Sequence, residues 1–598
     1  MPFIGMISEE NTENCIRREI LDKLAYIILD EIHYINDRDR GTVWEEIIIF
    51  RDKKTKILGL SATVPNAKDL SNWMESISGQ PCKLIQYDER IVKQTHAYYD
   101  KKRGPMDYQD MVYELYKAEQ RGKLPKKTTH IDFIKYANKN NLFPILFFSF
   151  SRRSCEELAE EAAITHSLLS KEDSDKVKTL AEQFEYEYPE LLESPSWQKV
   201  TLDALSGVCC HHAGLLPLAK RFVETLFEKK LCRVLYATET FAIGINFPVR
   251  TVCFTSLRKF DGYGFRNLNG SEYLQMAGRA GRRGFDELGK VFTLVNYEDL
   301  LRERLPDISL MKPEPVKSQF ALSYNTVINL SCNYEIEEAR LIFEKGLSDF
   351  QYKETLKVLD PNCKVIGTEI CPAYINLNKK LKKETDKSKL RHCPKEKRKK
   401  CEKYLSSIKK SNNHSPSRLL TYDFDKKVRL LNHLSYMNED KKLEARGEFC
   451  KNFHVQELLL TELLIEKDIV NLPMSRFVGI IGGLAYDGRD EYPKVRDEQE
   501  VYETISYLNV KEYEFGIQPK NSFNARGYQI VKMWMEDKSY DEISCMHDIE
   551  EGDFVSIMHR TIDLLRQVKV AFANDIEVVK YVNTCIKKAN RGIVEHFM

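Results

Sequence analysis

Short runs of apolar residues recur along the first half of the chain, and each run stops at polar residues. The first covers Leu24–Leu29 and stops at Asp30-Glu31, and the second covers Thr55–Leu60 and stops at Ser61–Thr63. Buried parallel strands have such runs and deliver polar side chains at their carboxyl ends. The pattern predicts two buried parallel strands of an α/β lobe over residues 1–92.

A helical pattern follows near Asn66, with Trp73 on its apolar face. Residues 93–139 are rich in Tyr, Lys and Gly, have no clear period, and predict a connector. Further strand-like runs separated by helical patterns then predict a second, doubly wound parallel sheet over residues 140–304. These runs cover residues 144–150, 208–212, 233–238, 251–255 and 289–295.

Beyond Pro313 the alternation of strand and helix stops, so the predicted fold class is α/β followed by all-α. Helical periodicity covers residues 305–360, and a charged helical hairpin interrupted at Pro394 is expected within residues 361–430. Amphipathic helices dominate residues 431–598. In one of them the apolar positions recur at steps of three and four, which predicts a single buried face. These positions are Phe554, Ile557, Met558, Ile562 and Leu565.

The composition fits a chain of several folded domains. Its 598 residues predict about three to five domains. With 42% hydrophobic and 30% charged residues, wholesale disorder, a collagen and a disulfide-stapled miniprotein are excluded. No apolar run is long enough to span a membrane, and the start lacks a secretory signal pattern. We therefore expect an intracellular protein, cytoplasmic or nuclear, whose 15 Cys are mainly reduced core thiols.

The charges are balanced overall but not locally. The chain has 91 Lys and Arg against 90 Asp and Glu, whereas Lys379–Lys403 has 13 Lys and Arg against 4 acids. This basic stretch is either an RNA-contacting arm or a solvated helical hairpin, and the sequence leaves both open.

The strand end at Asp30-Glu31-Ile32-His33 carries the first candidate chemistry. In nucleotide hydrolases an aspartate at this place holds Mg²⁺ through water, and the neighbouring glutamate orients or deprotonates the attacking water. The same residues are compatible with a solvated acidic turn, because Asp-Glu after an apolar run is common.

A run of glycines and arginines, Gln275–Gly284, is the second candidate. Glycines allow a close approach of backbone, and arginines at fixed spacing present planar forks to phosphate oxygens. The alternative is a basic turn, but ordered patterns on both sides favour a functional site.

Two strand ends of the second sheet, Cys210–Gly214 and Ala237–Asn246, have small and hydroxyl residues that suit contacts to a phosphodiester backbone. His211-His212 has no further ligands at metal spacing. The cysteines near His392 are Cys363, Cys371, Cys393 and Cys401, and they lack the usual short pair spacing. No structural zinc is therefore expected.

The order of these blocks resembles motifs II to VI of superfamily-2 helicases. More narrowly, Asp30–Glu46, Arg258–Gly262 and Gln275–Gly284 resemble the superkiller-like RNA helicases that feed the exosome. The resemblance implies tandem RecA-like lobes with the first incomplete, a winged helix over 305–360, a short basic stalk over 361–430 without an arch, and a C-terminal helical domain over 431–598.

The resemblance also implies a role for each matching residue. Asp30 would coordinate Mg²⁺ through water, Glu31 would be the general base, and His33 would link the ATP site to the facing lobe. Ser61 and Thr63 would couple hydrolysis to lobe closure. The residues expected to face the nucleotide are Gln275, Arg279, Arg282, Gly244 and Asn246, with Arg282 as the arginine finger. Those expected toward the RNA are Ser149, Thr238 and Arg560, with Asn246 on the same side of the second lobe.

The sequence departs from this family in one respect. The Gly-Lys-Ser/Thr loop that holds the triphosphate is not found, and only 29 residues precede Asp30. We therefore expect an N-terminally truncated ATP-dependent RNA helicase that moves 3′ to 5′, uses ATP and Mg²⁺, and has little ATPase as this chain alone. The alternatives are a catalytically dead RNA-binding scaffold and an archaeal-type DNA repair helicase. Expected partners are single-stranded or structured RNA and exosome-type nuclease or adaptor proteins, with no membrane.

Overall fold

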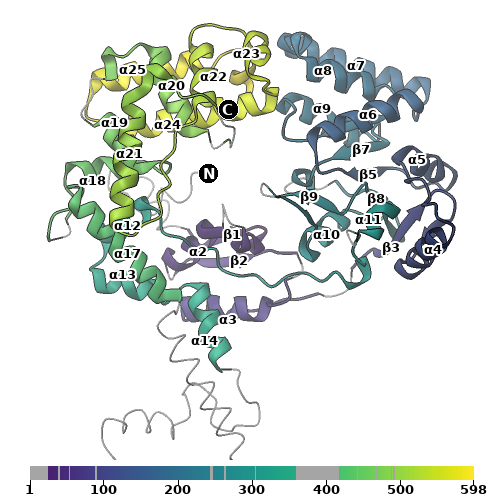
Figure 1. Cartoon of the computed structure of the whole chain (residues 1–598), viewed down its shortest axis with the longest axis horizontal. Coiled ribbons are helices and arrows are strands. Elements are labelled where there is room, and N and C mark those ends of the chain that lie inside the picture. Colours follow the sequence, from purple (N-terminus) through teal and green to yellow (C-terminus); the bar gives the residue numbers. More distant parts are fainter. Residues whose placement is uncertain are drawn as a thin grey trace, which may run out of the picture. The chain divides into compact units, whose positions relative to one another are not determined.

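The chain forms two compact units in the computed structural model (Figure 1). The structure describes residues 24–37, 41–52, 54–62, 64–87, 90–242, 247–261, 264–302, 305–357, 416–440, 442–465, 469–486, 488 and 492–597. Unit 1 comprises Met1–Gln86, Pro315–Asp468 and Arg496–Ser522. Unit 2 comprises Tyr87–Glu314, Ile469–Val495 and Phe523–Met598.

Unit 1 contains a small parallel sheet of β1 (Tyr26–Leu29) and β2 (Lys56–Gly59). Helices α2 (Gly41–Phe50) and α3 (Ala67–Ser78) accompany it. Trp73 is fully buried and donates a hydrogen bond from Nε1 to the Lys345 carbonyl at 2.7 Å, so the predicted apolar face of this helix is confirmed. The core of this region includes Leu29, Ile32, Ile35, Ile48, Trp73, Val316 and Leu347.

The first sheet is parallel as predicted, but the prediction that β1 and β2 are buried strands is wrong, because only Leu29 of their residues is buried. Leu29 is buried, whereas Tyr26 is 57% and Ile28 is 63% exposed. Side chains alternate between the two faces of a strand. The face with Leu29 joins the core of α2 and α3, and in the described part of the chain the other face has no covering layer.

The remaining elements of unit 1 are helical. They are η1 (Ile32–Asn36), α12 (Tyr324–Asn333), α13 (Ile336–Phe343), α14 (Leu347–Lys357), α17 (Pro416–His433), α18 (Ala445–Cys450), α19 (Glu457–Leu464), η7 (Arg496–Glu498) and α21 (Gln499–Glu514). Asn325 on α12 donates from Nδ2 to the carbonyls of Lys451 and Phe453 at 2.7 and 2.9 Å, which ties α12 to the chain after α18. Within residues 305–357 the described structure contains no strand.

Unit 2 is built on a seven-stranded sheet in the order β4-β3-β11-β8-β5-β7-β6. All neighbouring strands are parallel except β3 and β4. The strands are β3 (Lys93–Asp100), β4 (Gly104–Met106), β5 (Ile145–Phe148), β6 (Val208–His211), β7 (Val234–Ala237), β8 (Thr251–Phe254) and β11 (Leu288–Leu294). The predicted doubly wound parallel sheet is confirmed, and each predicted run over residues 140–304 contains a strand.

Residues 93–139, predicted as a connector, instead contribute two strands to this sheet and two helices to the same lobe. They comprise β3, β4, α4 (Tyr108–Gln120) and α5 (His130–Lys139). Only the last three residues of β3, Tyr98–Asp100, are buried, so the strand has no apolar run that its sequence could reveal.

Helices and a small hairpin complete the lobe. The helices are α6 (Arg152–Thr165), α7 (Lys171–Glu187), η2 (Pro189–Glu193), α8 (Pro195–Ala204), α9 (Pro217–Glu228), η3 (Glu239–Ala242), α10 (Gly270–Ala277), α11 (Tyr297–Leu301) and η4 (Ile308–Leu310). The hairpin pairs β9 (Arg258–Phe260) with β10 (Phe265–Asn267).

The C-terminal part of unit 2 is a bundle of helices. They are η6 (Ile469–Asn471), α20 (Met474–Ala485), α22 (Ala525–Met535), α23 (Tyr540–His547), α24 (Glu551–Ala571), α25 (Ile576–Ala589) and η8 (Gly592–Phe597). Gly482 lets α20 approach α22 closely, because a Cβ there would lie 2.5 Å from a methyl carbon of Val531. The five predicted apolar positions of α24 are all buried, which confirms that face.

Two general expectations can be compared with the described residues. None of the described helices has the length and apolarity that a membrane crossing needs. No disulfide joins any of the ten described cysteines, and seven of them are buried, as expected of reduced core thiols.

Candidate nucleotide and RNA sites

The acidic strand end of unit 1 lies where β1 leaves the sheet. Asp30 Oδ1 accepts a hydrogen bond from the Glu31 amide at 3.0 Å. Glu31 has a left-handed backbone with φ of 53°, which is uncommon for a residue with a side chain and turns the chain sharply into η1. The two carboxylates therefore stand at the carboxyl end of a parallel strand, where ligands of such sheets bind.

His33 connects this strand end to the next one. Its Nδ1 lies 3.2 Å from Ser61 Oγ and 3.3 Å from Glu31 Oε2. The Ile32 amide also donates to the Leu60 carbonyl at 2.8 Å, which places Ser61 beside the acidic turn. The structure thus brings together three predicted residues. Thr63 lies outside the described residues.

The environment of His33 favours its neutral form. Burial lowers the pKa of the imidazole, and the nearby Glu31 and Asp30 carboxylates act in the opposite direction. Both partners lie at Nδ1, so a neutral imidazole that carries its proton there can donate toward the Glu31 carboxylate and the Ser61 hydroxyl oxygen.

The predicted residues of the second sheet follow neighbouring strands. Ser149 comes directly after β5 and is buried, and Thr238 comes directly after β7 and is half-buried. The Ser149 amide donates to the Ala237 carbonyl at 3.0 Å, so the two strand ends lie side by side. Gly244 and Asn246 lie outside the described residues.

The glycine and arginine run follows α10. Gln275 is half-buried on this helix, and Arg279 lies in the turn after it. Arg282 forms a two-pronged ion pair with Asp286, with Nε at 2.7 Å from Oδ2 and Nη2 at 2.9 Å from Oδ1. Asp286 therefore holds the guanidinium through Nε and Nη2. The role of Arg282 as an arginine finger stays a prediction.

Gly281 is required by the geometry of this turn. Its φ of 95° is strained for any residue with a side chain, and a Cβ would lie 2.6 Å from a methyl carbon of Val92. The turn is also held by two residues that sequence reasoning missed. Arg90 Nη2 donates to the Gly278 carbonyl at 2.9 Å, and Gln94 Nε2 donates to the Ala277 and Ala280 carbonyls at 2.8 and 2.7 Å.

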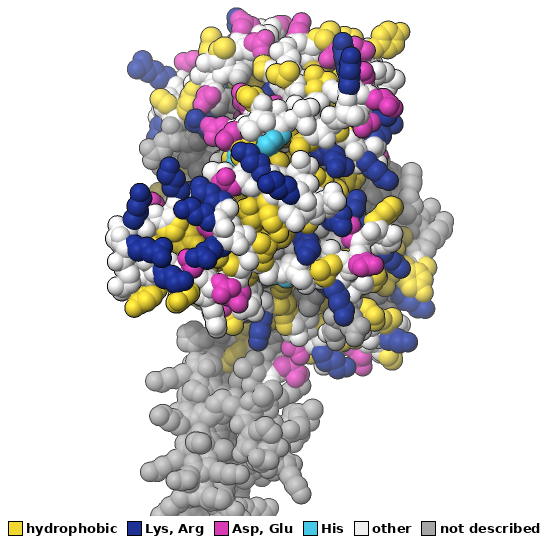
Figure 2. All heavy atoms as spheres, turned by 90° about the vertical axis from the view of Figure 1, so that its right-hand side faces the viewer, with side chains coloured by type: hydrophobic (Ala, Val, Ile, Leu, Met, Phe, Trp, Pro, Cys, Tyr) yellow, Lys and Arg dark blue, Asp and Glu magenta, His cyan; other side chains and the backbone are white. Residues whose placement is uncertain are grey.

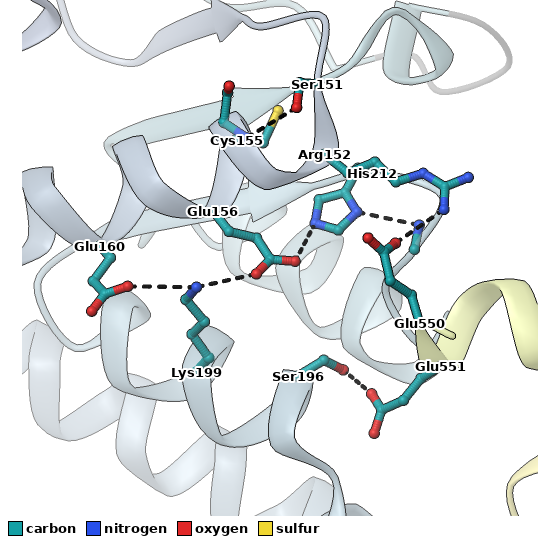
Figure 3. Close-up of polar contacts among 12 residues, drawn as sticks. Ser151, Arg152, Cys155, Glu156, Glu160, Ser196, Lys199, His212, Glu550 and Glu551 are labelled. Atoms are coloured by element: carbon teal, nitrogen blue, oxygen red, sulfur yellow. Dashed lines mark hydrogen bonds and ion pairs between the residues drawn. The ribbon is translucent and has the colours of Figure 1, made fainter. Parts of the chain in front are cut away.

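The two histidines at the end of β6 are paired with acids, and Figure 3 shows His212 beside Glu156. His211 Nε2 lies 3.1 Å from Glu224, and His212 Nε2 lies 3.1 Å from Glu156. His212 Nδ1 also accepts a hydrogen bond from the Gly214 amide at 3.2 Å. His212 thus fixes the loop to α6, on which Glu156 lies.

The same loop is joined to the C-terminal helices. The Gly552 amide of α24 donates to the Gly214 carbonyl at 3.0 Å. Arg152, in the first turn of α6, contacts Glu550 at 3.0 Å and also pairs with Asp553. Figure 3 shows Arg152 beside Glu550, just before α24. The loop that was predicted to contact the RNA backbone is therefore held from two sides. Arg560, the predicted RNA contact of this helix, is exposed.

Comparison with known proteins agrees with the order of these elements. Residues 4–70 match a model of DEAD/DEAH box helicases, residues 198–284 match the helicase conserved C-terminal domain, and residues 440–597 match the DSHCT (NUC185) domain. In these three regions the chain is similar to helicases. The expected tandem RecA-like lobes with a C-terminal helical domain are thereby confirmed.

Several curated DExH-box helicases are similar to the chain over more than half of its length. The DExH-box ATP-dependent RNA helicase DExH10 of Arabidopsis thaliana is 33% identical over 56% of this chain and 37% of its own. The exosome RNA helicase MTR4 of Homo sapiens is 34% identical over 56% of this chain and 34% of its own. The antiviral helicase SKI2 of Saccharomyces cerevisiae is 30% identical over 52% of this chain and 30% of its own. The chain thus matches about a third of the length of these relatives, and the recognised superkiller-like resemblance is confirmed.

Proposed function

We propose that the chain forms part of an ATP-dependent RNA helicase that moves 3′ to 5′ and feeds RNA to decay or processing. The contact of His33 with both Ser61 and Glu31 carries the proposal, because it joins the acidic strand end to the neighbouring strand end. A change in the contacts of the carboxylates would therefore alter the contact of His33 with Ser61. The printed name of the human relative, an exosome RNA helicase, supports the substrate class.

The acidic strand end fits a magnesium nucleotide. Among the described residues no Lys or Arg lies within 4.0 Å of the Asp30 or Glu31 carboxylate, and Asp30 is exposed. Carboxylate oxygens are suitable ligands for Mg²⁺. Asp30 would hold the ion through water, Glu31 would take the proton of the attacking water, and bound Mg²⁺ would neutralise charge on the phosphates. We assign the nucleotide-facing roles to Gln275, Arg279 and Arg282.

The experiment must address the triphosphate cradle, because the 598 residues contain no Gly-Lys-Ser/Thr loop. We expect this chain to bind single-stranded RNA and to hydrolyse ATP negligibly. A longer form that carries such a loop upstream and in frame should show RNA-stimulated hydrolysis. Glu31→Gln should lower that rate by about 10²-fold or more, since it removes the general base and keeps the side-chain shape.

Each result decides between the candidates. Hydrolysis by the longer form that survives Glu31→Gln would overturn the catalytic assignment. Tight RNA binding without an in-frame loop upstream would favour the second candidate, a scaffold that binds RNA without turnover. Competition between matched RNA and DNA strands addresses the DNA repair alternative, and a preference for DNA would overturn the RNA assignment.

A further inference from the structure

Helix α4 of unit 2 turns aromatic side chains toward solvent. Met111 on its inner face is fully buried, whereas Val112, Tyr113 and Tyr116 are 42%, 57% and 58% exposed. Positions three and four apart lie on one side of a helix, so these side chains form one stripe. Large apolar groups exposed together are informative, because single ones are ordinary.

Basic residues adjoin this stripe through direct contacts. Lys117 Nζ lies 4.0 Å from the centre of the Tyr113 ring and 3.3 Å from Glu114. Glu114 also lies 3.1 Å from Arg103, in the turn between β3 and β4. The turn between the two strands is therefore continuous with the aromatic stripe.

The same turn reaches the segment between α4 and α5. Lys101 Nζ donates to the Lys127 carbonyl at 3.2 Å, and the Lys101 amide donates to Thr128 Oγ1 at 3.2 Å. The contacts thus connect three parts of one surface: α4, the β3–β4 turn, and residues 121–127.

The acids of this region pair with only three of its cations, Lys101, Arg103 and Lys117. Residues 101–139 contain 10 Lys and Arg against 5 Asp and Glu. Asp107 and Asp132 accept backbone hydrogen bonds at helix starts, and Glu114 bridges two cations. Seven exposed cations of this region have no described acid within 4.0 Å. Two of them, Lys135 and Lys139, lie on α5. The other five lie in the β3–β4 turn or between α4 and α5, namely Lys102, Arg121, Lys123, Lys126 and Lys127. Figure 2 views the side of the molecule on which α4 and α5 lie, and Lys and Arg stand over much of it with hydrophobic side chains among them.

We propose that this α4 surface binds single-stranded RNA outside the helicase motifs. We define it by Lys102, Tyr113, Tyr116, Arg121, Lys123, Lys126 and Lys127. Single-stranded nucleic acids are bound by cations that follow the backbone and by aromatic rings on which bases stack. An acidic protein segment would satisfy the cations but would not need exposed ring faces, so RNA fits both features. The proposal rests on the proposed function, because it adds a second surface for the same substrate.

Matched variants in the full chain test the proposal. The α4 variant is Tyr116→Ser with Lys126→Ala and Lys127→Ala. The control is Tyr186→Ser with Lys176→Ala and Lys178→Ala on α7, where Tyr186 is 91% exposed and both lysines have acidic partners. We expect the α4 variant to raise the Kd for a fluorescent 30-nucleotide oligouridine about tenfold, and the α7 control to leave it unchanged.

The salt dependence and a crosslink locate the effect. Loss of two phosphate contacts should make the slope of log K against log salt shallower by about 1.4. A 4-thiouridine oligomer should crosslink to the peptide that contains Tyr113 and Tyr116. Equal affinity of the α4 variant and the control, with no such crosslink, would overturn this proposal alone. Loss of poly-glutamate binding without loss of RNA binding would overturn it in favour of an acidic protein partner. Failure of the unmodified chain to bind RNA would overturn the proposed function as well.

Discussion

Each unit contains a joint between a helicase lobe and helices that come later in the chain, and the two joints differ in their electrostatics. In unit 1, Glu45 and Glu46 of α2 are buried and accept hydrogen bonds from neutral groups. Glu45 accepts from Ser318 Oγ and the Leu347 amide, both at 2.7 Å, and Glu46 accepts from Thr326 Oγ1 at 3.2 Å. No Lys or Arg of the described residues lies within 4.0 Å of either carboxylate.

We call this contact of unit 1 the neutral joint. The corresponding contact of unit 2 is made of charged pairs, and we call it the charged joint. Arg152 pairs with Glu550 and Asp553, and Glu156 lies 3.1 Å from both His212 and Lys199. The comparison shows two ways to hold acids at a joint. Neutral donors leave the carboxylate costly to ionise, so the joint depends on pH. Cationic partners keep it ionised, so the joint depends on salt.

The pKa values agree with this contrast. Burial raises the pKa of Glu45 to about 6 and that of Glu46 to about 7. The pKa of Glu156 is lowered, mainly by its hydrogen bond with His212. Glu551 lies in the charged joint, but burial raises its pKa. The direction of the pKa shift therefore depends on the hydrogen-bond partners of a carboxylate rather than on the joint in which it lies. Its partners are the hydroxyls of Ser194 and Ser196.

The largest effect is expected from a methyl group at the charged joint. In Gly552→Ala the new Cβ would lie 2.3 Å from the Ala213 carbonyl oxygen and 2.7 Å from the Gly214 carbonyl carbon. Backbone atoms cannot move aside locally, so we expect a loss of about 3 kcal/mol or more in thermal unfolding monitored by circular dichroism.

The matched change at the neutral joint is Gly346→Ala. Its Cβ would lie 3.2 Å from the Phe343 carbonyl oxygen and 3.3 Å from Glu45, so small shifts relieve the contact. We expect a loss below about 1 kcal/mol. An equal loss of unfolding free energy in both variants would contradict the expectation that only Gly552 is too close to backbone atoms to accept a methyl group.

The second effect is the pH dependence of the neutral joint. Glu46 has a folded pKa of about 7 against 4.5 for its ordinary value, so folding favours its protonated form. The stabilisation is fully present below about pH 4.5 and is lost as pH rises through 7. Between pH 5 and 8 this amounts to roughly 2 kcal/mol.

Glu46→Gln should remove that part of the pH dependence, because the amide keeps an oxygen acceptor and does not titrate. Thermal unfolding at pH 5, 6, 7 and 8 measures it. Glu156→Gln is the comparison in the charged joint, and it should destabilise the protein at pH 7, since it removes the carboxylate that His212 and Lys199 share. An unchanged pH profile in Glu46→Gln would refute the assignment.

Sequence reasoning identifies those elements whose burial leaves an apolar pattern. The face of α24 and the five predicted strands of the second sheet are examples, because most of their side chains are buried apolar groups. Sequence reasoning does not predict strand β3, because most of its residues are exposed or half-buried. Sequence reasoning also does not identify Arg90 and Gln94. They donate to backbone carbonyls more than 180 residues away, and such a contact leaves no sequence pattern around either residue.

The candidate site divides in the same way. The contact of His33 with Ser61 follows from adjacent parallel strands, which a sequence pattern can reveal. Glu45 and Glu46 resemble a solvated acidic pair in the sequence, and their burial depends on Ser318, Thr326 and Leu347, which lie more than 270 residues later. The pairing of Arg282 with Asp286 is local, but its geometry depends on the turn that Gly281 permits.

The smallest effect is the salt dependence of the charged joint. Arg152 is 35% exposed, so solvent screens its pairs with Glu550 and Asp553, and Arg152→Met should cost about 1 kcal/mol at low salt. The loss should shrink as ionic strength rises from 0.05 to 0.5 M, since screening weakens exposed pairs in the unmodified chain too. Asp553→Asn alone and combined with Arg152→Met completes a double-mutant cycle in thermal unfolding. A coupling that is independent of salt would mean that packing of the arginine stem, rather than charge, holds this joint. Glu45→Gln, at the neutral joint, should show no change with salt.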